Sequence, residues 1–330
     1  MAPSDLSLPD AQLLTILQYL GTEDLGRIGR VNRQWYRVSH DTQLWRRVII
    51  PKVDNKYIRA VLKNFCGEHT TKIVLIGALK HSKLSVISDS LLHKILSICR
   101  LADLIVARIH LTPAQIRVLP TNLRKLSLLQ MDSRTDISHL NQLEFLDLRG
   151  SRKVLISPAS LTKLTHLSFA EGTTKLDDFM LNSNLFSRIT HLDLSFNHLT
   201  LRQMSILSTD CRSLQALDID YTRFPYTNQQ LELNFKNWFQ MGFSSLEQIK
   251  CCYVRCSGNL SQVSPFVRFS ADFELPPSVT VIHCKDYWPN VPYHIDSTRP
   301  CRDVAQCSLV SLLYPLVIRT PLSLEEHTMD

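Results

Sequence analysis

The hydrophobic positions of the first fifty residues follow the spacing of short amphipathic helices. Pro9 suits the first turn of a helix, and Gly21-Thr22 supplies a helix end followed by a helix start. The apolar positions are Leu13, Leu14, Ile16, Leu17, Leu20, Leu25, Ile28, Val31, Trp35 and Val38. About three short helices are predicted, and so small a unit buries too little surface to be stable alone. We therefore expect a partner, or the rest of the chain, to complete its core.

The middle of the chain repeats a strand pattern, LxxLxL, in which positions 1, 4 and 6 are apolar. The units begin at Leu101, Leu123, Leu143, Leu164, Ile189 and Leu214, with looser copies at Leu246 and Val279 and a degenerate copy at Thr71. Spacings of 20 to 25 residues separate the first six units from Leu101, which is typical of strand–helix repeats. The later spacings of 32 and 33 residues predict inserted loops.

Positions 4 and 6 of a unit lie on the same side of a strand, so they predict one continuous core shared by stacked units. Helix starts between the strands are marked by Ser88-Asp89, Thr112-Pro113, Ser157-Pro158 and Thr200. Strand and helix in alternation predict an α/β fold, with a parallel sheet on the concave face and helices and loops on the convex face.

The segment Leu8 to Val48 resembles an F-box. It combines the Leu8-Pro9 opening, the Asp24-Leu25 pair, the Val31-x3-Trp35 spacing and the Leu44-Trp45-Arg46 ending. The resemblance implies docking on the adaptor Skp1 and, through it, on a cullin-RING ubiquitin ligase. The residues expected to supply the docking and core surface are Leu8, Pro9, Leu13, Ile16, Leu17, Leu20, Leu25, Val31 and Trp35. The sequence leaves open which of these contact the partner and which only hold the helices together.

An F-box followed by such repeats resembles the F-box/leucine-rich-repeat family. Cys99 and Cys211, just before Leu101 and Leu214, resemble its cysteine-containing repeat subtype, and Asn197 stands where leucine-rich repeats place an Asn that bonds neighbouring backbone turns. The predicted division is an F-box (1–48), a linker (49–70), about nine repeats (71–284) and a C-terminal tail or cap (285–330).

The family resemblance implies a substrate-recognition subunit of a Skp1–cullin–F-box ubiquitin ligase. The alternative is a Skp1-binding scaffold with no degradation target. On either hypothesis we expect no catalytic residue and no cofactor, because the chain has no GxSxG, Walker, GxGxxG or HExxH motif.

Odd strand positions alternate away from the core onto the concave face, where a protein substrate is expected to bind. The candidate substrate-binding residues are Phe145, Asp147, His166, His191, Asp193, Phe196, Asp218, Asp220 and Tyr221. Carboxylates beside aromatic side chains favour a partner with a basic surface. The alternative is that Asp at position 5 belongs to the repeat consensus and has no connection with a ligand.

Composition and charge exclude several classes of partner. The net charge of +7 is modest and scattered over 330 residues, which argues against nucleic acid. The sequence contains no run of about 18 apolar residues, so it predicts no membrane-spanning helix. The first ten residues lack a secretory signal pattern, so we expect a cytoplasmic or nuclear protein with reduced thiols.

A cluster of potential zinc ligands lies near the end of the repeats. It comprises Cys251, Cys252, Cys256, His283 and Cys284. The repeat register places three of these cysteines inward, where a small thiol behaves as a hydrophobic side chain. Too few ligands remain for a four-coordinate zinc site, so we expect no metal.

Overall fold

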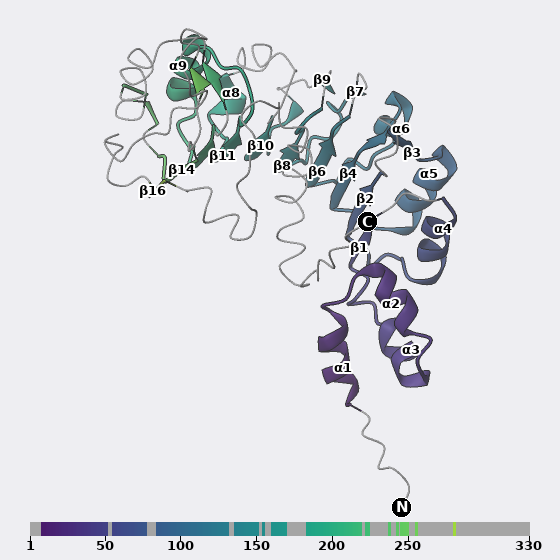
Figure 1. Cartoon of the computed structure of the whole chain (residues 1–330). Coiled ribbons are helices and arrows are strands. Elements are labelled where there is room, and N and C mark those ends of the chain that lie inside the picture. Colours follow the sequence, from purple (N-terminus) through teal and green to yellow (C-terminus); the bar gives the residue numbers. More distant parts are fainter. Residues whose placement is uncertain are drawn as a thin grey trace, which may run out of the picture.

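The computed structural model shows three N-terminal helices that continue into a curved parallel sheet with helices along its outer side (Figure 1). The expected α/β repeat fold is confirmed. The structure describes residues 8–51, 55–77, 84–131, 135–151, 154–155, 160–169, 183–219, 222–224, 237–238, 242–243, 245–250, 255–256 and 280–281.

The N-terminal unit consists of α1 (Asp10–Leu17), α2 (Thr22–Ile28) and α3 (Arg33–Ser39). α1 and α2 follow Pro9 and Gly21, neither of which makes a side-chain cap. Asn32 caps α3, because its side-chain oxygen accepts a hydrogen bond of 2.9 Å from the Trp35 amide. An Asn at this position typically stabilises a helix by about 1 kcal/mol relative to Ala.

The large sheet contains ten described strands, and every described pairing within it is parallel. Spatial order follows chain order, as expected for stacked repeats. The strands are β1 (Arg47–Ile50), β2 (Lys72–Ile76), β4 (Asp103–Ala107), β6 (Lys125–Leu129), β8 (Phe145–Asp147), β10 (His166–Ser168), β11 (His191–Asp193), β12 (Ala216–Asp218), β14 (Gln248–Lys250) and β16 (Thr280–Val281).

Helices and short strand pairs connect these strands. The helices are α4 (Asn55–Asn64), α5 (Asp89–Ile98), α6 (Pro113–Arg117), α8 (Ser183–Phe186) and α9 (Leu201–Asp210). The two-stranded pairs are β3 (Ser85–Val86) with β5 (Ile109–His110), β7 (Thr135–Asp136) with β9 (Val154–Leu155), and β13 (Arg223–Phe224) with β15 (Arg255–Cys256). Thr112 and Thr200 form capping boxes with Gln115 and Gln203, which confirms two of the expected helix starts. Ser88 precedes α5 without a side-chain cap, and Ser157-Pro158 lies outside the described residues.

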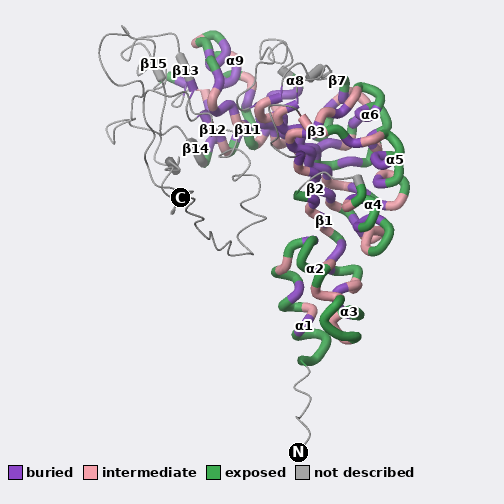
Figure 2. Tube along the Cα trace, turned by 45° about the vertical axis from the view of Figure 1, so that its right-hand side comes forward, coloured by how far each residue is buried: buried purple, intermediate pink, exposed green. Residues whose placement is uncertain are grey.

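One apolar core runs from the N-terminal unit through the repeats (Figure 2). In the units from β1 to β12, position 4 is at most 2% exposed, and so are most residues at position 6. The position-4 residues are Val48, Ile73, Leu104, Leu126, Leu146, Leu167, Leu192 and Leu217. Because each repeat buries its apolar side only against its neighbours, the array depends on stacking for its stability.

The first strand begins inside the segment expected to be the F-box. Val48 and Ile50 pair with Ile73 and Leu75, so Trp45 occupies position 1 of a repeat unit. The segment 49–70, expected to be a linker, contains the end of β1 and α4. The predicted boundary is therefore wrong, because the sheet begins at Arg47 rather than at residue 71.

Two predicted registers are wrong by one residue. The degenerate copy was expected to place Val74 and Ile76 at positions 4 and 6, but Ile73 and Leu75 pair with Leu104 and Val106 there. The last copy was expected to place Ile282 at position 4, but Val281 pairs with Ile249. Such a slip exchanges the two faces of a strand, so the pairing partners decide the register where apolar residues run consecutively.

Hydrogen bonds from buried polar side chains link successive repeats at the strand exits. Asn197 donates from Nδ2 to Phe169 O at 3.0 Å and to Leu194 O at 2.9 Å, as the family resemblance implied. Ser151 takes the equivalent place two repeats earlier: its hydroxyl donates to Leu128 O at 2.5 Å and accepts from Met131 N at 3.0 Å. At Ser151 a smaller side chain thus supplies hydrogen bonds of the kind that Asn197 makes.

We expect Asn197→Ala to lower the free energy of unfolding by about 1–3 kcal/mol, because it removes the hydrogen bonds that this buried side chain donates to the carbonyls of Phe169 and Leu194. Chemical denaturation of the two proteins measures the effect. His198→Ala, at an exposed neighbouring position, is the control and should be neutral. Equal stability of Asn197→Ala and wild type would contradict a structural role for these bonds.

Candidate functional site

The N-terminal unit exposes a group of large apolar side chains. Leu8, Ile16 and Val31, all expected at the docking surface, are 43%, 46% and 63% exposed. Pro9 is also exposed. The sequence analysis missed two exposed residues, Tyr19, which follows α1, and Tyr36, which lies in the middle of α3. Both could have been recognised in the sequence, because each is an aromatic residue outside the apolar positions of a predicted helix.

Other residues proposed for docking belong to the core. Leu13, Leu17 and Leu25 are at most 4% exposed, and they pack where the three helices meet. Leu20 and Trp35 are half-buried against the same core. The structure therefore separates the exposed candidates from those that hold the helices together.

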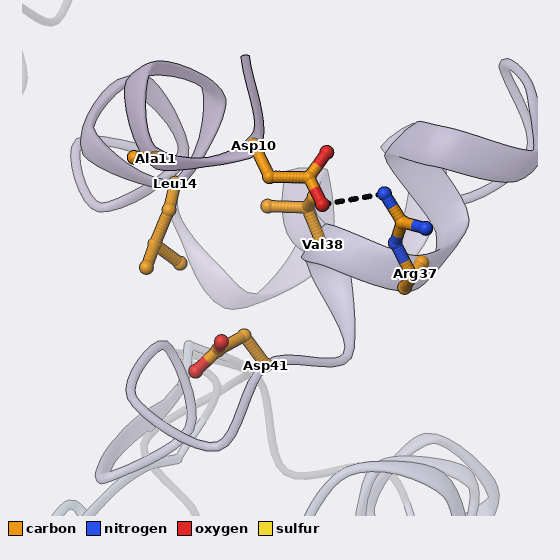
Figure 3. A pocket seen from close by; sticks show the side chains of 6 residues that line it. All are labelled: Asp10, Ala11, Leu14, Arg37, Val38 and Asp41. Carbon is orange, nitrogen blue, oxygen red and sulfur yellow. Dashed lines mark hydrogen bonds and ion pairs between the residues drawn. The ribbon is translucent and has the colours of Figure 1, made fainter.

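A polar network fixes the start of α1 against α3. Gln34 donates from Nε2 to Leu8 O at 2.6 Å and to Asp10 Oδ1 at 2.9 Å. The Arg37 guanidinium pairs with Asp10 Oδ2 at 2.5 Å, at the edge of a surface pocket that Ala11, Leu14, Val38 and Asp41 also line (Figure 3). Hydrogen bonding to Gln34, with the charge of Arg37, holds the pKa of Asp10 below its usual value. These contacts hold Leu8 and Pro9 beside α3, so the apolar surface is built from two helices.

The concave face is less acidic than its sequence indicated. Asp147 is fully buried, and Arg149 binds both of its carboxylate oxygens at 2.7–3.1 Å. Asp193 accepts hydrogen bonds from the Ser168 hydroxyl and from the amide and hydroxyl of Ser195. The nearby carboxylates outweigh burial and raise the pKa of Arg149. Asp147 is therefore a structural partner of Arg149 and is not accessible to a substrate.

Three of the candidate side chains form a stack across neighbouring strands. The rings of Phe145 and His166 have centroids 5.9 Å apart, and those of His166 and His191 are 4.1 Å apart and nearly parallel. The residues lie at position 3 of β8, β10 and β11. We call Phe145, His166 and His191 the histidine ladder.

The end of the concave face nearest the N-terminal unit is apolar. Val74, Ile105, Ala107 and Leu129 form a buried cluster that is separate from the main core. They occupy positions 5 and 7, where the central repeats carry Asp147 and Arg149. The sequence analysis missed this cluster, because its register for β2 was wrong.

The remaining candidates are placed only in part. Phe196 is half-buried with a φ of 60°, at a strand exit equivalent to Arg108 and Gln130, which have φ values of 55°. Asp218 is half-buried on β12. Asp220, Tyr221, His283, Cys284 and the side chains of Cys251, Cys252 and Cys256 lie outside the described residues. Within the described part of the chain, no three His, Cys, Asp or Glu side chains are placed to hold a metal ion, and no helix is long and apolar enough to cross a membrane.

Comparison with known proteins supports the assignment of the N-terminal unit. A family model described as F-box-like matches residues 5–51. No curated protein matches the sequence. Similar solved structures include an internalin of Listeria monocytogenes, at 13% identity over 58% of this chain and 51% of that chain, with a TM-score of 0.39. The structure of the TLR13–ssRNA13 complex is similar at 16% identity over 67% of this chain and 35% of that chain, with a TM-score of 0.42. The matched regions span only about half of the internalin and about a third of the other chain.

The three N-terminal helices therefore form an F-box-like domain, and the parallel strands in LxxLxL register form a leucine-rich-repeat array. The chain thus combines an F-box-like segment at its N-terminus with a stack of LxxLxL repeats.

Proposed function

We propose that this chain is the substrate-recognition subunit of a Skp1–cullin–F-box ubiquitin ligase. Its F-box-like domain docks on Skp1, and its repeat array binds the protein to be ubiquitinated. The chain is not itself an enzyme. It holds a target lysine close to the charged conjugating enzyme, and the resulting rise in effective concentration drives transfer.

The distribution of exposed apolar side chains carries the proposal. Seven large hydrophobic side chains are exposed in the described part of the chain. Five of them belong to the F-box-like domain, although this domain covers only residues 5–51. They are Leu8, Ile16, Tyr19, Val31 and Tyr36. A small domain that exposes this much apolar surface is typical of one that a protein partner completes.

The firm attachment of the F-box-like domain to the array also supports the proposal. Trp45 closes the helical unit and begins the first repeat, and Ile49 N donates to Thr22 Oγ1 at 3.0 Å between β1 and α2. Because the two parts share one core, a substrate on the concave face is held at a defined position relative to the docked adaptor.

A non-catalytic role is consistent with the environment of Cys211. This residue is buried in the core, and burial raises the pKa of its thiol, which disfavours the nucleophilic thiolate. We place the complex in the cytoplasm or nucleus, where thiols stay reduced.

The alternative is a Skp1-binding scaffold that delivers no target for ubiquitination. Reconstitution separates the two. The chain, purified with Skp1, is combined with cullin, RING subunit, activating and conjugating enzymes, and a co-purified partner. We expect ubiquitin transfer to that partner, and its loss when Ile16→Asp with Val31→Asp removes Skp1 docking. Assembly of the ligase without transfer to any partner of the array would favour the scaffold.

A further inference from the structure

The apolar end of the concave face is buried, although the helices that the structure describes in the repeats lie along the other side of the sheet (Figure 1). Val74, Ile105, Ala107 and Leu129 are at most 7% exposed. Side chains stand roughly perpendicular to a sheet, so the neighbouring strands shield their sides and leave their ends open. The burial of these four residues therefore indicates a further element over this end of the face.

The strands at this end have the sequences of a sheet that is covered on both faces. Strands buried on both sides read as near-continuous apolar runs, whereas strands with one wet face alternate. β1, β2 and β4 contain the runs VII, IVLI and LIVA. β8 and β11, by contrast, read FLD and HLD. The requirement for a cover is thus confined to the first repeats, and it ends where the concave face becomes charged.

One segment outside the described residues has the composition of such a cover. Residues 304–318 include no charged side chain. Within them, residues 307–318 read CSLVSLLYPLVI and are apolar at nine of twelve positions. Folded proteins rarely leave so large an apolar surface in water unless it serves an interaction. Asp303 and Arg319 flank the uncharged run, so the part of the chain that favours burial is short and well defined.

The chain is long enough to bring this segment to the first repeats. Val281 on β16 is the last described residue, and 25 residues separate it from Cys307. β16 lies eight strand spacings from β2, which is about 40 Å across the sheet. An extended chain of 25 residues spans about 80 Å. Because the segment is tethered to the array, its effective concentration at the cluster far exceeds that of a separate protein.

We propose that residues 307–318 fold back along the concave face and pack on Val74, Ile105, Ala107 and Leu129. The segment is an internal cover for the apolar end of the face. It leaves the histidine ladder and the charged central repeats as the part of the face that a partner protein can reach. This docking is a property of the chain itself and does not depend on the proposed function.

Photo-crosslinking of the full chain tests the contact directly. The photoreactive amino acid p-benzoylphenylalanine replaces Tyr314, an aromatic residue within the segment, and mass spectrometry identifies the crosslinked peptides. We expect crosslinks to the peptides that carry β2, β4 and β6. A mixture of unlabelled and isotope-labelled chains should give crosslinks within one chain. Crosslinks only to other parts of the chain, crosslinks between two copies, or no crosslinks would overturn the proposal.

Thiol labelling tests the cover from the side of the sheet. Residue 107 is 1% exposed, so the thiol introduced by Ala107→Cys should react slowly with a maleimide. Adding Leu312→Asp with Leu313→Asp should raise its labelling rate at least about tenfold, because the cover then opens. Leu322→Asp with Leu324→Asp, which adds the same charge beyond the segment, should leave the rate unchanged. Peptide-resolved mass spectrometry separates this thiol from the native cysteines.

Equal labelling rates in all three proteins would overturn the proposal. The crosslinking experiment leaves the array unaltered, so it decides the question even if Ala107→Cys destabilises the fold. Neither experiment uses Skp1 or ubiquitin transfer as its readout. Failure of the proposed function would therefore leave the crosslinks and the labelling rates as predicted, and failure of the cover would leave ligase assembly unaffected.

Discussion

Ile16→Asp combined with Val31→Asp is expected to abolish Skp1 binding while the repeat array stays folded. Both side chains are about half or more exposed, so the substitutions leave the core of the F-box-like domain intact. A central apolar anchor of an interface typically contributes about 2 kcal/mol, and two such losses together weaken binding by roughly a thousandfold. Calorimetric or interferometric titration with purified Skp1 measures the loss.

The chain provides a matched control for this pair. Val86 and Val118 are also exposed, at 64% and 38%, but they lie in the repeat array. Val86→Asp with Val118→Asp should bind Skp1 as wild type does. If the variant with Ile16→Asp and Val31→Asp bound Skp1 as tightly as wild type does, these two residues would not belong to the docking surface. Leu13 and Leu17 are unsuitable for this test, because their substitution disrupts the helical core and weakens binding for a different reason.

Trp45→Ala is expected to destabilise the F-box-like domain and the first repeats together. Its ring is 1% exposed and stacks on Phe65 with centroids 4.0 Å apart, and its Nε1 donates to Ser39 O at 2.7 Å. Removing a buried Trp typically costs about 3–5 kcal/mol. Thermal unfolding should show a large fall in melting temperature, and hydrogen exchange should show lost protection in both α3 and β1.

Trp45→Phe is the matched variant. It keeps an aromatic ring against Phe65 and loses the Nε1 bond, so its effect should be much smaller than that of Trp45→Ala. If Trp45→Ala exposed only the amides of α3 and left β1 and β2 protected, the helices and the array would be independent units. The proposed rigid placement of substrate relative to adaptor would then lose its structural basis.

The sequence predicted the central repeats well because two independent signals agree there. From Leu123 to Ile219, apolar residues alternate with polar ones in most of each strand, and the spacing recurs at about the same length. The alternation therefore places Leu146 and Leu192 on the core face of their strands, and both are buried as expected. At β1 and β2, by contrast, runs such as Val48 to Ile50 and Ile73 to Ile76 are apolar at every position. Alternation then fits two registers, and only pairing with the adjacent strand selects one.

The functional surfaces depended on tertiary structure for a similar reason. The sequence showed that the F-box-like domain has more apolar residues than three short helices need for their own core. Leu17 is buried and Ile16 is exposed only because α3 packs against one side of α1. Sequence also determined that Asp147 and Asp193 lie on the concave face. Only the folded chain decided that Arg149 neutralises Asp147, and that the rings of His166 and His191, 25 residues apart in sequence, stack on each other. Periodicity is a local property of the chain, whereas burial, ion pairing and ring stacking depend on which distant segments the fold brings together.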